Sequence, residues 1–202
     1  MAFVLDDAFL PATLTASPMS DDAFAAFCAE HPDLSFEMTV DGELIVMPPN
    51  YSLTGVRNSR ICRQLDAWAE QDGRGMSGDS STGFLLPNGA RRSPDASWTL
   101  HTRIAQLDPA SREKYWHLSP DFVIELRSSS DRLRVLKAKM HEWISNGAQL
   151  GWLIDPEGKS VTIYRRGQKA ETRTDIDSMA GEGPVDGFVL DLRFVWNPLG
   201  GR

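Results

Sequence analysis

The sequence has only two cysteines, Cys28 and Cys62, and they form no Cys-x-x-Cys pair. Two isolated cysteines supply neither a disulfide framework nor a zinc motif, so both are predicted to be small buried hydrophobic residues. The four histidines are far apart along the chain and fit no zinc spacing such as His-Glu-x-x-His. The sequence therefore argues against a zinc site built from cysteine or histidine.

Long hydrophobic runs are also lacking. No apolar stretch approaches the roughly 20 residues that a bilayer-spanning helix needs. The first seven residues have no basic start and no long apolar stretch, so a signal peptide is not expected. Together with the scarcity of cysteine, these features favour a cytoplasmic protein without a membrane anchor.

The chain lacks an excess of positive charge, since its formal net charge is −7. Phosphate contacts supply most of the affinity of nucleic-acid-binding proteins, which therefore usually present a basic face. The acidic balance argues against a tight, non-specific DNA binder. Basic residues nevertheless cluster locally, notably at Arg57, Arg60 and Arg63, which fall among the outward positions of a predicted helix.

At 202 residues with 41% apolar residues, the chain can bury the core of one globular domain. We expect an N-terminal arm over residues 1–19 and a single domain over residues 20–202. Ser20 before two aspartates predicts a helix start, and that helix should end near Glu30, before Pro32. Asp41-Gly42 between two alternating runs predicts a hairpin over residues 36–47, closed by Pro48-Pro49.

The rest of the chain alternates helical and extended patterns. Helices are predicted over residues 52–70 and from Asp131, as N-cap, to Asn146-Gly147. Strands are predicted over residues 83–86, 91–100, 121–126, 150–154, 161–165 and 188–196. The strand–helix–strand unit over residues 121–154 should be a crossover between parallel neighbours. The predicted fold class is α/β, of the α+β type, with helices flanking a mixed sheet.

The tripeptide Ser-Pro-Asp occurs twice and ends at Asp95 and at Asp121, each time running directly into the extended, largely apolar part of a predicted strand, residues 96–100 and 122–126. The second strand carries Glu125, where an apolar residue would be less costly to bury. Asp121 and Glu125 share a face but lie about 13 Å apart along the strand, too far to bind one ion together. Asp95 on the adjacent strand is therefore the candidate partner of Glu125, and Asp121 is interpreted as a residue at the strand entry.

Two strand-borne carboxylates with backbone carbonyl oxygens and waters suit Mg²⁺ or Mn²⁺. Two cations could act beside such an ion. Arg127 lies two residues after Glu125 on the same face, and suits a phosphate contact. Lys139 lies at the edge of the apolar stripe of the following helix, from which a long side chain can reach the strand, and suits a role in orienting water.

These residues carry a resemblance to a known family. Asp95 followed by Glu125-Leu126-Arg127 looks like the PD-(D/E)xK nuclease pattern, with arginine in the usual place of lysine. More closely, the chain resembles the Uma-two family of restriction endonucleases, which was first catalogued as a domain of unknown function. The similar stretches lie within about residues 20–160, at residues 41–49, 81–96, 120–128, 139–147 and 153–156.

The resemblance implies a restriction-endonuclease-like fold, divalent-metal-dependent hydrolysis of nucleic acid, and a homodimer as a common assembly. By that pattern Asp95 and Glu125 are the metal ligands, and Lys139 stands in for the motif lysine, moved from strand to helix. Arg127 is the departure from the general pattern. Glu37, at the start of the hairpin, also falls at a position typical of the family.

Other interpretations of the same residues stay open on the sequence alone. Glu125 could form a structural ion pair with Arg127 or Lys139. Asp95 could be a structural residue of a turn or strand start after Pro94, and Lys139 could be a solvated helix residue. The predicted function is a Mg²⁺- or Mn²⁺-dependent endonuclease acting on DNA. The alternatives are an inactive nuclease-fold module that binds nucleic acid or a protein partner, and a metal-dependent hydrolase of another phosphoester.

Overall fold

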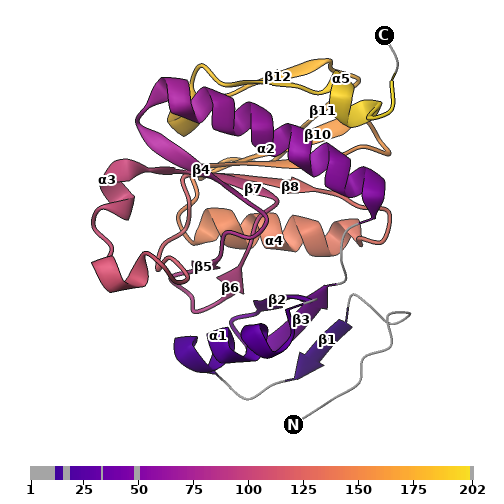
Figure 1. The fold of residues 1–202 in the computed structure, drawn as a ribbon. Coiled ribbons are helices and arrows are strands. Elements are labelled where there is room, and N and C mark those ends of the chain that lie inside the picture. The colour runs from indigo at the N-terminus through magenta and orange to yellow at the C-terminus, as the bar shows by residue number, and fades with distance from the viewer. Residues whose placement is uncertain (1–11, 16–18, 33, 48–50, 201–202) are drawn as a thin grey trace.

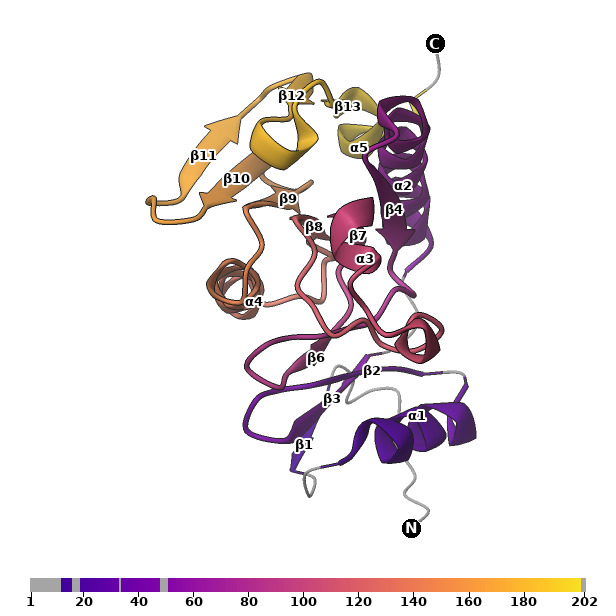
Figure 2. The ribbon, with the colours of Figure 1, turned by 90° about the vertical axis from the view of Figure 1, so that its left-hand side faces the viewer.

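The computed structural model describes residues 12–15, 19–32, 34–47 and 51–200. A six-stranded sheet forms its centre, in the order β11 (Glu171–Thr174), β10 (Ser160–Arg165), β9 (Leu150–Asp155), β8 (Phe122–Leu126), β7 (Ala96–Leu100) and β4 (Gly75–Asp79). Helix α2 (Ser52–Asp72) covers one face and helix α4 (Leu133–Ser145) the other, as Figures 1 and 2 show. The predicted fold class, a mixed sheet flanked by helices, is confirmed.

A second, smaller sheet lies beside the central one with helix α1 (Asp21–Glu30), toward the N-terminal end of the molecule (Figure 2). Its strand order is β1 (Ala12–Thr15), β3 (Glu43–Met47), β2 (Ser35–Met38), β6 (Arg91–Arg92) and β5 (Phe84–Leu85). Short helices connect and close the chain: α3 (His101–Ile104), the 3₁₀ turns at Pro109–Ser111 and Gly183–Val185, and α5 (Arg193–Trp196).

Strand β8 is the central strand that the apolar run predicts, and all five of its residues are buried. Its side chains alternate between the two faces of the sheet. Phe122, Ile124 and Leu126 pack in the cluster that α2 covers, whereas Val123 packs in the cluster that α4 covers. Glu125, one alternation further along, therefore points toward α4.

The predicted crossover is confirmed, because β8 and β9 pair in parallel from Phe122 opposite Leu150 to Leu126 opposite Ile154. Helix α4 connects them and lays its apolar stripe on the sheet. Met140 and Trp143 of that stripe are fully buried. This packing sets the height of α4 over β8, and with it the reach of Lys139, which lies at the edge of the stripe.

The N-terminal predictions hold where the structure describes them. The Ser20 hydroxyl accepts a hydrogen bond from the amide of Ala23 and caps α1. Strands β2 and β3 pair antiparallel, and Gly42 adopts φ 81° in the turn between them, a conformation that glycine adopts without strain. Pro48 and Pro49, predicted to close the hairpin, lie outside the described residues.

Part of the segment predicted as an N-terminal arm is a strand instead. Residues 12–15 pair antiparallel with β3 and form an edge of the small sheet. The rest of that segment lies outside the described residues, apart from Met19, which packs against the core of the small sheet.

The continuous strand predicted over residues 91–100 is wrong. The chain forms β6 and β7 in two different sheets, separated by Ser93-Pro94-Asp95. Proline has no amide hydrogen for a ladder, so Pro94 suits the point at which the chain leaves one sheet and enters the next. The first Ser-Pro-Asp tripeptide is therefore a crossing between the two sheets.

Two further element predictions need correction. Asp131 does not cap α4: Arg132 is the N-cap residue, and the Asp131 carboxylate accepts hydrogen bonds from the amide and hydroxyl of Ser128. The strand predicted over residues 188–196 ends early, at β13 (Val189–Asp191), which pairs with β12 (Ser178–Ala180). Leu192 and Val195, three residues apart, are both fully buried, a spacing that favours the turn of helix α5.

No helix within the described ranges is long and apolar enough to span a membrane.

Candidate active site

The strand register brings the two predicted acids together. Strands β7 and β8 pair antiparallel with Ala96 opposite Ile124, so the next position outward places Asp95 beside Glu125. One oxygen of the Asp95 carboxylate accepts a hydrogen bond of 2.7 Å from the amide of Leu126. This bond fixes the carboxylate against the neighbouring strand. Burial raises the pKa of Asp95 to about 6.

Glu125 is 2% exposed and is held from the α4 side. One carboxylate oxygen accepts a hydrogen bond of 2.8 Å from the indole nitrogen of Trp143, and Lys139 Nζ lies 2.9 Å and 3.1 Å from the two oxygens. Burial raises the pKa of Glu125 to about 8 although Lys139 lowers it, and the charge of Asp95 adds to the increase. The charged forms of the two acids therefore repel each other in a buried environment that contains little water to screen them.

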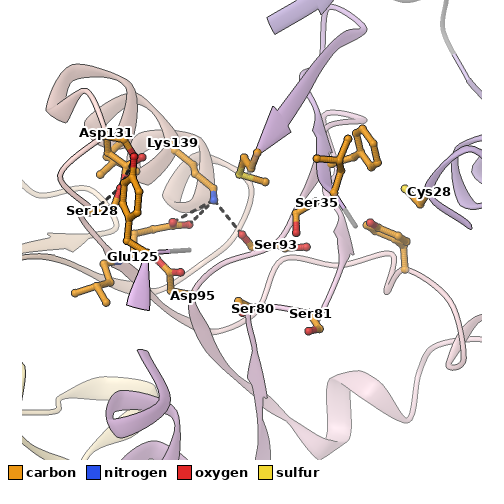
Figure 3. A pocket seen from close by; sticks show the side chains of 18 residues that line it. Cys28, Ser35, Ser80, Ser81, Ser93, Asp95, Glu125, Ser128, Asp131 and Lys139 are labelled. Carbon is orange, nitrogen blue, oxygen red and sulfur yellow. Dashed lines mark hydrogen bonds and ion pairs between the residues drawn. The ribbon is translucent and has the colours of Figure 1, made fainter. Parts of the chain in front are cut away.

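Lys139 reaches this point from α4, as the stripe-edge position predicts, and its side chain is 13% exposed. Besides Glu125, its ammonium group contacts the carbonyl oxygen of Ser93 at 3.0 Å and a Glu37 carboxylate oxygen at 2.7 Å. Burial lowers the pKa of Lys139, but Glu125 and Glu37 outweigh that effect and raise it. The two carboxylates therefore favour the charged ammonium form of Lys139. Figure 3 marks its contacts with Glu125 and Ser93.

Asp95, Glu125 and Lys139 line one pocket of about 370 Å³. Figure 3 shows Lys139 between Glu125 and Ser93, with Asp95 below Glu125 and with Ser80 and Ser81 to the right of Asp95. Much of the remaining lining is hydroxyl-bearing: Ser35, Tyr51, Ser80, Ser81, Ser93, Tyr115, Ser128 and Ser130. Hydroxyl groups donate hydrogen bonds without adding charge, which suits a polar or anionic ligand beside the acids.

Glu37, which the family resemblance singled out at the start of the hairpin, belongs to the same cluster. It is 2% exposed and also forms a salt bridge of 3.0 Å with Arg92. Burial raises its pKa, but the charges of Lys139 and Arg92 outweigh that effect and lower it. The sequence signal was an acid between the apolar residues Phe36 and Met38, of the same kind as Glu125 in β8.

Arg127 is not brought to this cluster. Its guanidinium contacts Asp155 at 2.8 Å and Glu157 at 3.3 Å, and it is absent from the described lining of the pocket. Asp121 is fully buried at the other end of β8, where it pairs with Arg103 and accepts a hydrogen bond from the amide of Leu100. It has a structural role at the strand entry, as predicted.

The arginines of α2 are largely engaged within the chain. Arg57 donates to the carbonyl oxygen of Val195 at 2.9 Å, and the guanidinium of Arg60 lies 5.3 Å from the centre of the Phe194 ring. Both therefore hold helix α5 against α2. Arg63 is exposed. The predicted basic face is mainly a packing contact with the C-terminal segment.

The donor set of the pocket suits a hard divalent cation. Asp95 and Glu125 offer carboxylate oxygens, and burial raises the pKa of both, so a nearby divalent cation would favour their charged forms. Within the described ranges, no group of three or more His, Cys, Asp or Glu side chains is placed to hold a metal ion. Mg²⁺ is usually bound through one or two carboxylates and keeps several waters, so two acids suffice for it.

Asp95→Asn should stabilise the metal-free protein. A carboxyl group whose pKa is higher in the folded than in the unfolded state disfavours folding increasingly as the pH rises toward the folded pKa, here about 6. We expect a gain of about 1–3 kcal/mol in the free energy of unfolding at pH 8, shrinking toward pH 4. Chemical denaturation with a chelator present measures it. Equal stability of both proteins at pH 8 would contradict the raised pKa of Asp95.

Comparisons with known proteins place the geometry in context. A family described as "Putative restriction endonuclease", Uma2, matches residues 21–193. The fold is similar to that of a crystal structure from Anabaena variabilis, titled as a "putative nuclease belonging to DUF820". The two share 18% identity with a TM-score of 0.71, over 89% of this chain and 98% of that one. No curated protein matches the chain.

Proposed function

Because the chain belongs to the Uma2 family of restriction endonucleases, we propose that it is a divalent-metal-dependent endonuclease that hydrolyses phosphodiester bonds of DNA. Family membership supports a nuclease activity in general. The observation that carries the finer proposal is the convergence of Asp95, Glu125 and Lys139 on one polar pocket. Two acids can hold a divalent cation and an ammonium group beside them can orient water or phosphate, a combination that suits metal-assisted hydrolysis of a phosphodiester.

The proposed roles follow from the contacts. Asp95 and Glu125 would hold Mg²⁺ or Mn²⁺, which when bound polarises the phosphodiester and lowers the pKa of an attacking water. Lys139 orients that water or a phosphate oxygen with its ammonium hydrogens. The hydrogen bond from Leu126 to Asp95 and that from Trp143 to Glu125 keep both carboxylates in place before substrate arrives.

Arg127 is not included in the proposed catalytic set, because Asp155 and Glu157 already engage its guanidinium. Its place in the motif suggested a phosphate contact, but the lysine function is carried by Lys139 from α4. The predicted single domain over residues 20–202, the cytoplasmic location and the homodimer remain predictions.

Metal removal tests the proposal. The purified protein should convert supercoiled plasmid to nicked and linear forms with Mg²⁺ or Mn²⁺, and a chelator should stop the reaction. Because the net charge is −7, few phosphate contacts are expected, so the affinity for DNA should be low and its decline with rising salt shallow. Gel electrophoresis over time, repeated at several salt concentrations, measures both effects.

The same assay separates the alternatives. Cutting of RNA but not of DNA would change the substrate class. DNA binding in a mobility-shift assay with no cutting in either metal would favour the inactive binding module. Hydrolysis of a small phosphoester with no cutting of plasmid would point to another phosphoesterase. Any of these three results would overturn the proposed DNA endonuclease.

A further inference from the structure

Resting on the proposed function, we infer that Glu37 is a positioning residue, which holds Lys139 ready for catalysis after Glu125 has turned to a metal ion. Glu37 lies on β2, in the small sheet, whereas Asp95, Glu125 and Lys139 belong to the central sheet and its helix α4. The small sheet would then contribute a functional residue to the active site.

The argument begins with the number of hydrogens on Lys139. An ammonium group has three N–H donors and no acceptor. Four oxygen atoms lie within 3.1 Å of Lys139 Nζ: two from Glu125, one from Glu37 and the carbonyl oxygen of Ser93. Two of the four acceptors lie outside Glu125, so Lys139 keeps its contacts with Glu37 and Ser93 when it releases Glu125.

The two anchors outside Glu125 are themselves fixed. Ser93 lies in the crossing between β6 and β7, and its peptide contacts both partners: its amide donates to Glu37 at 3.0 Å, and its carbonyl oxygen accepts from Lys139. Arg92 holds the other oxygen of Glu37 at 3.0 Å. The Glu37 carboxylate is thus bound by Arg92, by the amide of Ser93 and by Lys139. These contacts do not depend on Glu125, so they hold Glu37 in place when Glu125 binds a metal ion.

If Glu125 held a metal ion and no longer accepted from Lys139, the contacts of the ammonium group with Glu37 and Ser93 would remain. Glu37 and Ser93 then occupy two of the three ammonium hydrogens and keep Lys139 in place. The third hydrogen is left for a water or a phosphate oxygen in the pocket. Without the Glu37 charge, Lys139 would follow Glu125 and compete with the metal ion for it.

The chain offers a matched control at Glu142. Glu142 also pairs with Arg92, at 2.5 Å, so Glu142→Gln and Glu37→Gln each remove one carboxylate from the same arginine. Only Glu37 contacts Lys139 among these two acids. Differences between the variants therefore report the lysine contact and not the loss of a partner for Arg92.

The experiment measures plasmid cutting and Mn²⁺ binding for wild type, Glu37→Gln and Glu142→Gln, with melting temperature as the check on folding. For Glu37→Gln we expect kcat to fall about 10- to 100-fold with the KM for DNA unchanged, and Mn²⁺ affinity to fall by about tenfold. Glu142→Gln should retain wild-type values. In a Lys139→Met background, Glu37→Gln should reduce neither quantity much further, because the residue through which it acts is gone.

Two results would overturn the inference while leaving the proposed function intact. One is an active wild type for which Glu37→Gln behaves as Glu142→Gln does. The other is a Glu37→Gln effect that persists in full in the Lys139→Met background, which would indicate a structural or direct role. A wild type that neither binds Mn²⁺ nor cuts DNA would instead overturn the proposed function and, with it, this inference.

Discussion

Glu125→Gln is expected to abolish metal-dependent cutting, with a loss of at least about 10³-fold in kcat. The amide has the same shape and can still accept hydrogen bonds from Trp143 and Lys139, so the pocket should keep its form. What it lacks is the charge that binds a divalent cation. A bound metal ion supplies several kcal/mol of transition-state stabilisation, and about 1.4 kcal/mol corresponds to a factor of ten in rate.

The same substitution should not harm the fold. Burial raises the pKa of Glu125 to about 8, which means that the charge of Glu125 destabilises the folded protein when no metal is bound. Glu125→Gln should therefore melt no lower than wild type at pH 8 when a chelator is present. The measurements are single-turnover cutting, Mn²⁺ calorimetry and thermal melting.

The outcomes separate clearly. Lost cutting together with lost Mn²⁺ binding and an unchanged or higher melting temperature supports the metal role. Retained cutting removes Glu125 from the mechanism. Lost cutting together with a large fall in melting temperature would assign Glu125 to the structural ion pair with Lys139 that the sequence left open.

Lys139→Met is expected to reduce kcat by about 10²- to 10³-fold, the usual loss when one preorganised hydrogen-bond donor is removed from an active site. Metal affinity should not fall, because the variant removes a cation that competes for Glu125. Lys137→Met on the same helix is the matched control: Lys137 is exposed, and its loss should leave cutting unchanged.

Lys139→Met is also expected to destabilise the protein, so a loss of activity could come from unfolding. A double variant separates the two causes. Removing Lys139 leaves Glu37 and Glu125 buried without their shared ammonium, which costs about 3–5 kcal/mol for a buried pair. Adding Glu37→Gln removes one of the two buried carboxylate charges left without a partner, and should restore much of the melting temperature but none of the activity. If activity returned with stability, Lys139 would be a structural residue and its catalytic role would be wrong.

The local rules of the sequence predicted a large part of the fold. The serine cap of α1, the Asp-Gly hairpin and the apolar run of β8 each depend on neighbours within a few residues, and all three are confirmed. The alternation of side chains and the rise per residue along β8 were enough to separate Glu125 from Asp121. Local patterns were less reliable at Pro94, where the chain changes sheets, and at Leu192, where a strand gives way to a helix.

The site itself divides along the same line. The sequence by itself determined that Asp95 and Glu125 belong to neighbouring extended segments and that Lys139 lies at the edge of the apolar stripe of a helix. It could do so because the strand and helix periods fix the direction in which a side chain points. Only the tertiary structure decided which cations and acids meet. In the folded protein Arg127 pairs with Asp155, and Glu37, which lies on a strand of the second sheet, pairs with Lys139. Such contacts depend on how sheets and helices pack across long sequence separations, and no local period encodes that packing.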